Sequence, residues 1–152
     1  RPGDDLAVAS STGRMLRLPI DDSTIPVMGR TAQGPVLMRL LPGESIVGAA
    51  TAAAGGDVLL ISQLGQLKRL GIDHLRRCQR GAIGEIGLRF EQRNDALTDL
   101  RSTTARVSVE TQAGSLRLAS DSLPVEDGRG TGQQLKLPKG QTVQRLLPLI
   151  DG

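Results

Sequence analysis

The chain repeats one pattern three times, with a period near fifty residues. Each copy opens with an apolar stretch, reaches a glycine, and continues with a stretch in which basic and apolar residues mix. The glycines at this point are Gly13, Gly65 and Gly114, which lie 52 and 49 residues apart. Two short apolar runs joined by a glycine turn are typical of a β-hairpin. We therefore expect one hairpin in each copy.

A second glycine motif follows each hairpin and repeats independently of the first. Gly34, Gly84 and Gly132 lie 50 and 48 residues apart, and a further apolar stretch closes each copy. A period near fifty with about four short strands per copy is typical of the blades of a propeller. The sequence predicts an all-β, propeller-like fold of three blades in a single domain, with repeats at residues 6–54, 58–104 and 107–149.

Three blades are fewer than a closed propeller uses, because propellers close with about four to eight. We therefore expect the three blades to be part of a larger disc. The chain begins with Arg1 rather than Met and shows no signal peptide, which we interpret as a fragment of a longer intracellular protein. Helix is scarce, and its best candidate, residues 72–78, is equally compatible with a loop.

The composition excludes several kinds of active site. Phe90 is the one aromatic residue, so the chain has no tyrosine nucleophile and no aromatic platform for unpaired bases. Cys78 and His74 are single, which excludes an internal disulfide, a cysteine-rich zinc site and a pair of histidine ligands. No Walker A, H-E-x-x-H or G-x-S-x-G motif occurs. No apolar run reaches the ~18 residues that a membrane helix needs.

The charge is mildly positive and unevenly spread. The 19 basic and 16 acidic residues give a net charge of +3, and sixteen of the 19 basic residues are arginine. Residues 66–93 hold seven basic and three acidic side chains, an excess of four. Arginine binds phosphate bidentately and keeps its charge when partly buried. The segment therefore indicates a polyanion as partner, with a solvated loop balanced by acids elsewhere as the alternative.

Basic residues also recur at equivalent places in the repeats. Arg30, Arg80 and Arg129 stand in the glycine loops, where glycine exposes backbone N–H groups and arginine supplies charge, a combination that suits phosphate. The alternative is a turn with a solvated arginine. A second set of basic residues lies on the strand after each turn glycine, where we interpret them as further contacts for the polyanion. The alternative is that these charges protect an edge strand from pairing with another chain. These strand residues and the run that follows them are Arg14, Arg17, Lys68, Arg69, Arg117, Arg76 and Arg77.

These motifs resemble the repeats of the C-terminal domain found in the A subunits of DNA gyrase and of its relative topoisomerase IV. The sequence IPVMGRTAQG at 25–34, followed by VLMRL at 36–40, carries the first match. The sequence GQLKRL at 65–70 is similar to the family's glycine-x-x-Lys-Arg turn, and QRGAIG at 79–84 is similar to its glycine loop. The gyrase box, a Gln-Arg-Arg-Gly-Gly-Arg-Gly type of loop in the family's first blade, is not intact here.

The resemblance implies a β-pinwheel, a propeller-like disc whose blades exchange strands, of which this chain is about half. It implies non-sequence-specific binding and wrapping of duplex DNA along a basic rim, in support of ATP-dependent supercoiling by the parent topoisomerase. It carries DNA contacts over to Lys68 and Arg69 in the turn motif and to Arg30 and Arg80 in the glycine loops. With the repeated cations above, the candidate DNA-binding set is Arg14, Arg17, Arg30, Lys68, Arg69, Arg76, Arg77, Arg80 and Arg129.

The resemblance also implies which activities belong to other parts of the parent enzyme. The cleavage tyrosine belongs to another domain, so the chain is not an enzyme by itself. No cofactor or metal is expected here, because ATP and magnesium serve other parts of the parent enzyme. The expected partners are double-stranded DNA, the other domains of the same polypeptide and a gyrase B-like ATPase subunit, in the cytoplasm of a bacterium or in an organelle of bacterial origin. The main alternative is a propeller-type scaffold that binds an acidic protein; an enzyme built on a propeller is the weaker one.

Overall fold

A computed structural model describes residues 4–20 and 38–149 of the chain. The three predicted hairpins are present, and in each of them two antiparallel strands meet around the turn glycine. They are β1 (Asp5–Ser10) with β2 (Arg14–Pro19), β4 (Asp57–Ser62) with β5 (Gln66–Gly71), and β8 (Arg106–Thr111) with β9 (Ser115–Ala119). The equivalent register pairs Asp5↔Pro19, Asp57↔Gly71 and Arg106↔Ala119 align the three hairpins, of which the third is one residue shorter.

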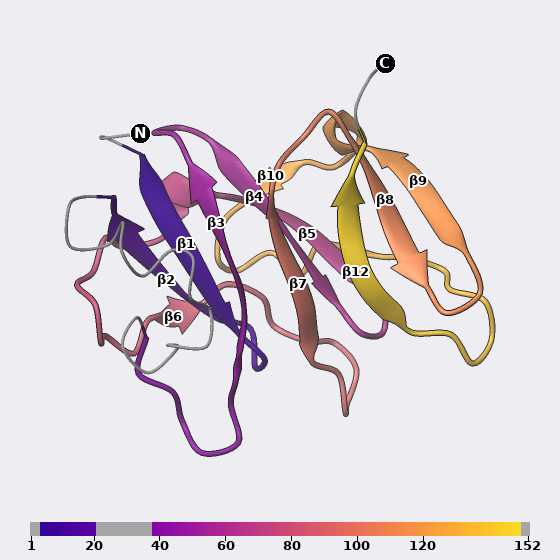
Figure 1. The fold of residues 1–152 in the computed structure, drawn as a ribbon, viewed down its shortest axis with the longest axis horizontal. Helices are drawn as coiled ribbons and strands as arrows, with labels where there is room; N and C mark the ends of the chain where they lie inside the picture. Colours follow the sequence, from indigo (N-terminus) through magenta and orange to yellow (C-terminus); the bar gives the residue numbers. More distant parts are fainter. Residues whose placement is uncertain (1–3, 21–37, 150–152) are drawn as a thin grey trace.

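The closing apolar stretch of each repeat forms the strand on the other side of its own hairpin. β3 (Ile46–Ala52) pairs with β1, β7 (Leu97–Ser102) with β4, and β12 (Val143–Pro148) with β8, all antiparallel. The neighbouring sheets meet along these strands, since β3 packs against β7 and β7 against β12. The three sheets consequently stand side by side as blades, in chain order across the molecule (Figure 1).

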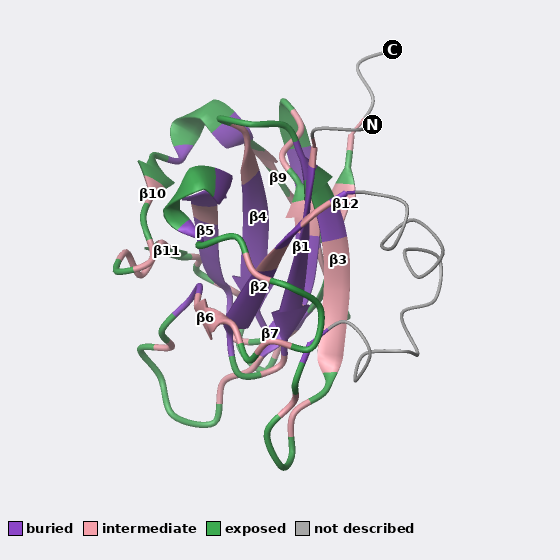
Figure 2. Cartoon of the chain, turned by 90° about the vertical axis from the view of Figure 1, so that its left-hand side faces the viewer, coloured by how far each residue is buried: buried purple, intermediate pink, exposed green. Residues whose placement is uncertain are grey.

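Each of the first two sheets receives its outermost strand from the following repeat. β6 (Glu85–Ile86) pairs with β2, and β10 (Val125–Glu126) and β11 (Gln133–Gln134) both pair with β5. The sheet orders are β3-β1-β2-β6, then β7-β4-β5-β10 with β11 also on β5, then β12-β8-β9. The sheets thus cross the predicted repeat boundaries. Figure 2 shows β3 and β12 on one side of the molecule and β10 and β11 on the other.

Apolar side chains on both faces of the central strands hold the blades together. Leu59 and Ile61 of β4 point into the cluster shared with the third sheet, whereas Val58 and Leu60 point into the cluster shared with the first. Burial on both faces explains why these strands read as continuous apolar runs rather than as alternating ones. In Figure 2, β1 and β4 are coloured as buried, whereas much of β3 is only partly covered.

Helix is confined to two short turns in the described part of the chain. The 3-10 helices η3 (Ile72–His74) and η4 (Ser120–Ser122) follow β5 and β9 at equivalent places. The predicted helical candidate at residues 72–78 is thus a single 3-10 turn followed by loop. None of the described helical segments has the length and apolar character that a membrane span requires.

Candidate nucleic-acid interface

Arg17 joins the first repeat to the second rather than pointing into solvent. Its Nε donates to Asp5 Oδ2 at 2.6 Å, and its NH1 donates at 3.0 Å to the carbonyl of Leu75, just after η3. Arg77 binds the same carboxylate through its Nε, at 3.0 Å from Asp5 Oδ1, although half of its own side chain stays exposed. Because Asp5 is completely buried, these two arginines neutralise a carboxylate that water does not reach.

Arg69 makes the equivalent connection between the second repeat and the third. Its Nε lies 2.9 Å from Asp57 Oδ1, and its NH1 donates to the carbonyls of Ser120 at 3.1 Å and Leu123 at 3.4 Å. The arginine of the turn motif therefore binds the 3-10 helix of the next blade. This is a structural role that its position on a basic strand did not reveal.

Arg14 and Lys68 lie inside the protein. Arg14 is 7% exposed and Lys68 is 0% exposed. The Lys68 ammonium donates to the carbonyl of Gly87 at 2.7 Å. Burial lowers the pKa of Lys68, although the carboxylates of Glu126 and Asp127 partly oppose this effect. Neither predicted contact residue points into solvent, because segments of its own repeat and of the next repeat cover it.

The remaining members of the predicted set lie at the surface or outside the described residues. Arg76, Arg80 and Arg129 are exposed. The backbone N–H of Arg129 donates to Asp127 Oδ1 at 2.8 Å and thereby lowers the pKa of that exposed carboxyl. Arg30 lies outside the described residues. Arg76, Arg80 and Arg129, with the half-exposed Arg77, are the predicted residues whose charge solvent or a polyanion can reach.

The glycine loops pack against the preceding sheet. A Cβ on Gly84 would lie 2.3 Å from the carbonyl oxygen of Met15 in β2, and a Cβ on Gly132 would lie 2.3 Å from that of Leu67 in β5. Close approach therefore explains these glycines, but what approaches is a neighbouring strand rather than the phosphate that the sequence suggested. The arginines of these loops are carried on backbone that the blade fixes in place.

Sequence reasoning did not single out three exposed cations at equivalent positions. Residues 38–40, 88–90 and 135–137 each read apolar–basic–apolar, and their apolar side chains pack into the blade clusters. The basic side chains between them, Arg39, Arg89 and Lys136, are exposed and have no ion pair among the described residues. Their signal was the recurrence of one cation between two core residues, at a spacing of 50 and 47 residues.

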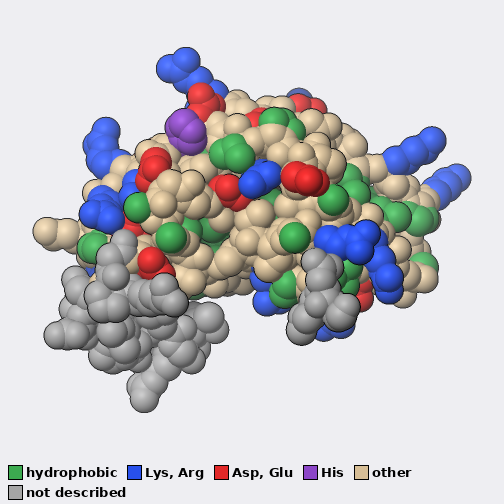
Figure 3. Space-filling model, turned by 90° about the horizontal axis from the view of Figure 1, so that it is seen from above, with side chains coloured by type: hydrophobic (Ala, Val, Ile, Leu, Met, Phe, Trp, Pro, Cys, Tyr) green, Lys and Arg blue, Asp and Glu red, His purple; other side chains and the backbone are tan. Residues whose placement is uncertain are grey.

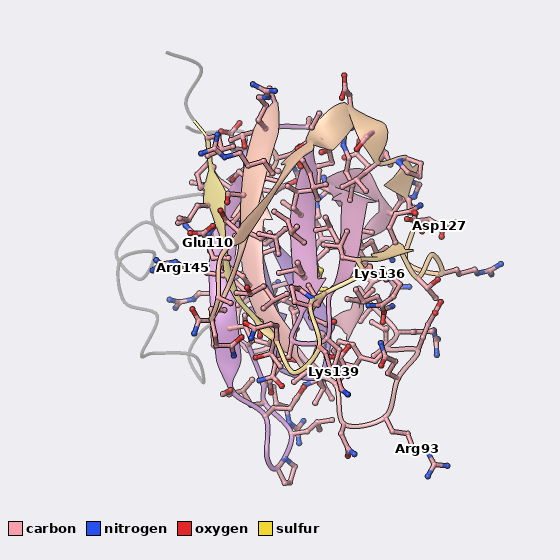
Figure 4. All side chains as sticks on the ribbon, turned by 90° about the vertical axis from the view of Figure 1, so that its right-hand side faces the viewer. Arg93, Glu110, Asp127, Lys136, Lys139 and Arg145 are labelled. Carbon is pink, nitrogen blue, oxygen red and sulfur yellow. The ribbon has the colours of Figure 1, made fainter. Side chains whose placement is uncertain are left out.

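Other exposed cations lie away from these segments. Figure 3 shows several Lys and Arg side chains projecting from the periphery of the face seen from above. In Figure 4, Arg93 points away from the sheets at the tip of its loop, Lys136 and Lys139 lie on the segment between β11 and β12, and Arg145 lies beside its register partner Glu110. Arg117, a weaker candidate in the sequence, is exposed on β9. The periphery is thus basic on more than one blade.

Glu44 anchors the segment that carries Arg39. Its carboxylate accepts hydrogen bonds from Arg14, Thr12, the Ser10 hydroxyl at 2.7 Å and the backbone N–H of Leu41 at 2.6 Å. Burial alone would raise the pKa of this carboxyl, but these hydrogen bonds outweigh it and lower the pKa from 4.5 to about 2. The ionised form of Glu44 is therefore part of the folded structure.

We expect the contribution of Glu44 to stability to fade in acid. Because its pKa is lower in the folded chain than in the unfolded one, the contribution is complete above pH 4.5 and is lost as the pH falls toward about 2. The measurement is the free energy of unfolding in urea, followed by circular dichroism, for the wild-type chain and Glu44→Gln. The difference between them should shrink steadily over that range; a constant difference would contradict the assignment.

The described residues offer few groups for metal binding or for acid–base catalysis. In the described part of the chain, no group of three or more His, Cys, Asp or Glu side chains is arranged to hold a metal ion. One shallow hollow near the start of β4 is lined by Asp57, Arg69 and neighbouring backbone, and another lies where β3, β7 and the end of β12 meet. In the first hollow, the charged groups Asp57 and Arg69 are bound to each other, and in the second the charged lining residue is Arg101.

Comparison with known families gives a match over the first two repeats. A family described as "DNA gyrase C-terminal domain, beta-propeller" matches residues 4–53 and 56–104. The A subunit of DNA topoisomerase 4 from Synechocystis sp. is 35% identical over 96 residues, which cover 63% of this chain and 10% of that protein. The A subunit of DNA gyrase from Aminobacterium colombiense is 30% identical over 146 residues, which cover 93% and 18%. The chain thus spans less than a fifth of the length of these relatives.

Solved structures with a similar fold belong to the same group of proteins. The C-terminal domain of DNA topoisomerase IV superposes with a TM-score of 0.73 at 14% identity, over 99% of this chain and 48% of that one. The E. coli ParC C-terminal domain gives 0.64 at 17% identity, over 97% and 64%. These likenesses confirm the predicted propeller-like β-pinwheel fold, and with the family match they lead to one conclusion: the chain belongs to the DNA gyrase C-terminal domain family.

Proposed function

We propose that this chain binds double-stranded DNA with little preference for base sequence. The contact surface is formed by residues 38–40, 88–90 and 135–137, which we call the outer segments. The observation that carries the proposal is the recurrence of an exposed cation at one position of each blade, in Arg39, Arg89 and Lys136. The exposed arginines of the glycine loops, Arg80 and Arg129, extend this series. Cations that recur with the blades follow an arc, and a duplex presents its phosphates to such an arc as a regular array.

Curvature gives this binding a mechanical consequence, because a duplex that follows the arc must bend. Bending ~20–30 base pairs through 40–90° costs on the order of 1–6 kcal/mol. Phosphate contacts and the release of counterions must exceed that cost, so binding weakens steeply as salt rises. Base readout contributes little, because arginine and lysine bind phosphates and the contact segments carry few of the aromatic or amide side chains that read bases.

In the parent enzyme, this surface wraps DNA and presents a second segment for strand passage in a type IIA topoisomerase. That role is proposed on family membership, as are the partners: the other domains of the same polypeptide and an ATPase subunit of the gyrase B kind. ATP hydrolysis, magnesium and strand cleavage belong to those parts, in a bacterial nucleoid or an organelle of bacterial origin. This chain contributes the binding surface.

The test is binding of the chain to duplexes of increasing length, measured by fluorescence anisotropy across a salt series. A curved surface that spans several blades should gain affinity from about 10 to about 40 base pairs, and the logarithm of the binding constant should fall linearly with that of the salt concentration. Two duplexes of equal length and unrelated sequence serve as the control and should bind alike. Affinity that does not depend on length, with equal competition by heparin, would instead favour the scaffold for an acidic protein.

A further inference from the structure

In each of the first two blades, a buried side-chain group binds backbone groups of two successive repeats. We call this group the clasp, and the two blades build it from different side chains. In the second blade, the Gln66 amide nitrogen donates to the carbonyls of Arg89 at 2.7 Å and Thr131 at 2.8 Å, and its Oε1 accepts from the backbone N–H of Glu91 at 3.1 Å. Gln66 is 1% exposed. A single amide thus satisfies three backbone groups that come from two different repeats.

In the first blade, an ion pair makes the equivalent contacts. The Arg14 guanidinium donates to the carbonyl of Arg39 at 3.1 Å and to that of Ile83, whereas Glu44 Oε1 accepts from the backbone N–H of Leu41 at 2.6 Å. Arg14 begins β2 as Gln66 begins β5. Arg14 thus provides the hydrogen-bond donors that the Gln66 amide nitrogen provides in the second blade. Glu44 provides the acceptor that Gln66 Oε1 provides there.

The backbone groups that the clasp joins carry the exposed cations. Arg39 and Arg89 are themselves the residues whose carbonyls are held. Ile83 and Thr131 lie in the glycine loops of the next repeat, at three and two residues from Arg80 and Arg129. In the second blade, both carbonyls bind the same nitrogen atom, so the two segments are in contact there. Each clasp therefore fixes a cation of one repeat beside the arginine loop of the following repeat.

We propose that Gln66 and the Arg14–Glu44 pair are positioning residues for DNA, each holding cations of two successive repeats as one phosphate-binding unit. The proposal rests on the proposed function and adds to it where the bound phosphates lie, at the junctions between blades. A fixed pair of cations loses less conformational entropy on binding than two independently moving ones. The buried clasp is thus coupled to affinity although it does not touch DNA.

The experiment removes the clasp of the second blade and measures DNA binding across a salt series. Gln66→Leu should lower the slope of log affinity against log salt by roughly 1–2, because Arg89 and Arg129 cease to act together. In a chain that already carries Arg89→Ala and Arg129→Ala, Gln66→Leu should have no further effect. Thr111→Val, which removes a buried hydroxyl that donates to the carbonyl of Gly114 in the third hairpin, is the control for general destabilisation and should leave the slope unchanged.

A rescue variant separates positioning from folding. Asp95 occupies the position in the second blade that Glu44 occupies in the first. The next residue shows the equivalence: the carbonyl of Ser45 accepts from the N–H of Ser11, and the carbonyl of Ala96 accepts from the N–H of Gln63. The Asp95 Oδ2 is buried without a hydrogen-bond partner. By analogy with Arg14, which donates to Glu44 from the equivalent position, we expect an arginine at position 66 to supply that partner. Gln66→Arg with Asp95→Glu transplants the first blade's pair into the second and should restore the salt slope that Gln66→Leu loses.

Two outcomes would overturn the proposal in different ways. If the wild-type chain does not bind duplex DNA, the proposed function fails and the positioning role fails with it. If the wild-type chain binds and Gln66→Leu keeps the full slope while hydrogen exchange at the Glu91 amide accelerates, the clasp is broken without consequence, and only the positioning role fails. Should Gln66→Leu not fold, Gln66→Glu, which keeps the acceptor and loses the donors, replaces it in the same comparison.

Discussion

Gly132→Ala is expected to lower the free energy of unfolding by roughly 3 kcal/mol or more, and Gly84→Ala should do the same. Gly84 and Gly132 have φ of +79° and +74°, a conformation that costs alanine energy wherever it occurs. The added Cβ would also lie 2.3 Å from a backbone oxygen of the preceding sheet. The oxygen belongs to a paired strand, so relief requires that the glycine loop leave the blade. Because the chain lacks Trp and Tyr, urea unfolding is followed by circular dichroism.

Two other glycines provide a control with the same backbone conformation. Gly81 and Gly140 have φ of +85° and +79°, and a Cβ on either would meet nothing within 4 Å. Gly81→Ala and Gly140→Ala should therefore cost only about 1 kcal/mol. The difference between the two pairs measures the packing of one repeat's loop on the previous sheet. Equal losses in all four variants would contradict the proposed contact.

The hairpins could be predicted from the sequence because they are local. Their strands and turn glycines are close in the chain, so a repeated pattern of apolar runs is sufficient to find them. The exchanged strands could not be predicted from pattern alone, because β6 and β11 are only two residues long. Each of them also pairs with a sheet whose hairpin belongs to the preceding repeat. That feature came from the family resemblance.

The exchange also explains why some of the predicted site residues are buried. Lys68 occupies the register position of Leu16 and Leu116, and a strand from the next repeat covers it, which no local pattern indicates. The sequence pattern does not reveal Asp57 as the partner of Arg69, because the two residues meet only in the folded hairpin. Alternation places Arg39, Arg89 and Lys136 at the surface, but it does not identify every exposed cation, since Arg17 lies between Leu16 and Leu18 and still binds the buried Asp5.

Removing the three equivalent exposed cations should have the largest effect on DNA binding. Arg39→Ala, Arg89→Ala and Lys136→Ala together should reduce the slope of log affinity against log salt by about 2.7, or 0.9 for each phosphate contact, and weaken binding on the order of a hundredfold at low salt. The fold should be unaffected, because these side chains are exposed and the apolar neighbours that anchor them remain. Fluorescence anisotropy with a duplex of about 40 base pairs, repeated across a salt series, provides the slope.

The matched control removes the same charge from strands that carry none of the three equivalent cations. Arg101→Ala, Arg106→Ala and Arg145→Ala also lower the net charge by three, and these residues lie on β7, β8 and β12. If long-range attraction alone drove binding, the two triple variants would weaken it equally. If phosphates contact the outer segments directly, the first variant loses nearly three contacts and the second loses few, because direct contact and counterion release are local to the bound duplex. Equal slopes for the two variants would therefore refute the outer surface as the DNA contact, even if the chain binds DNA.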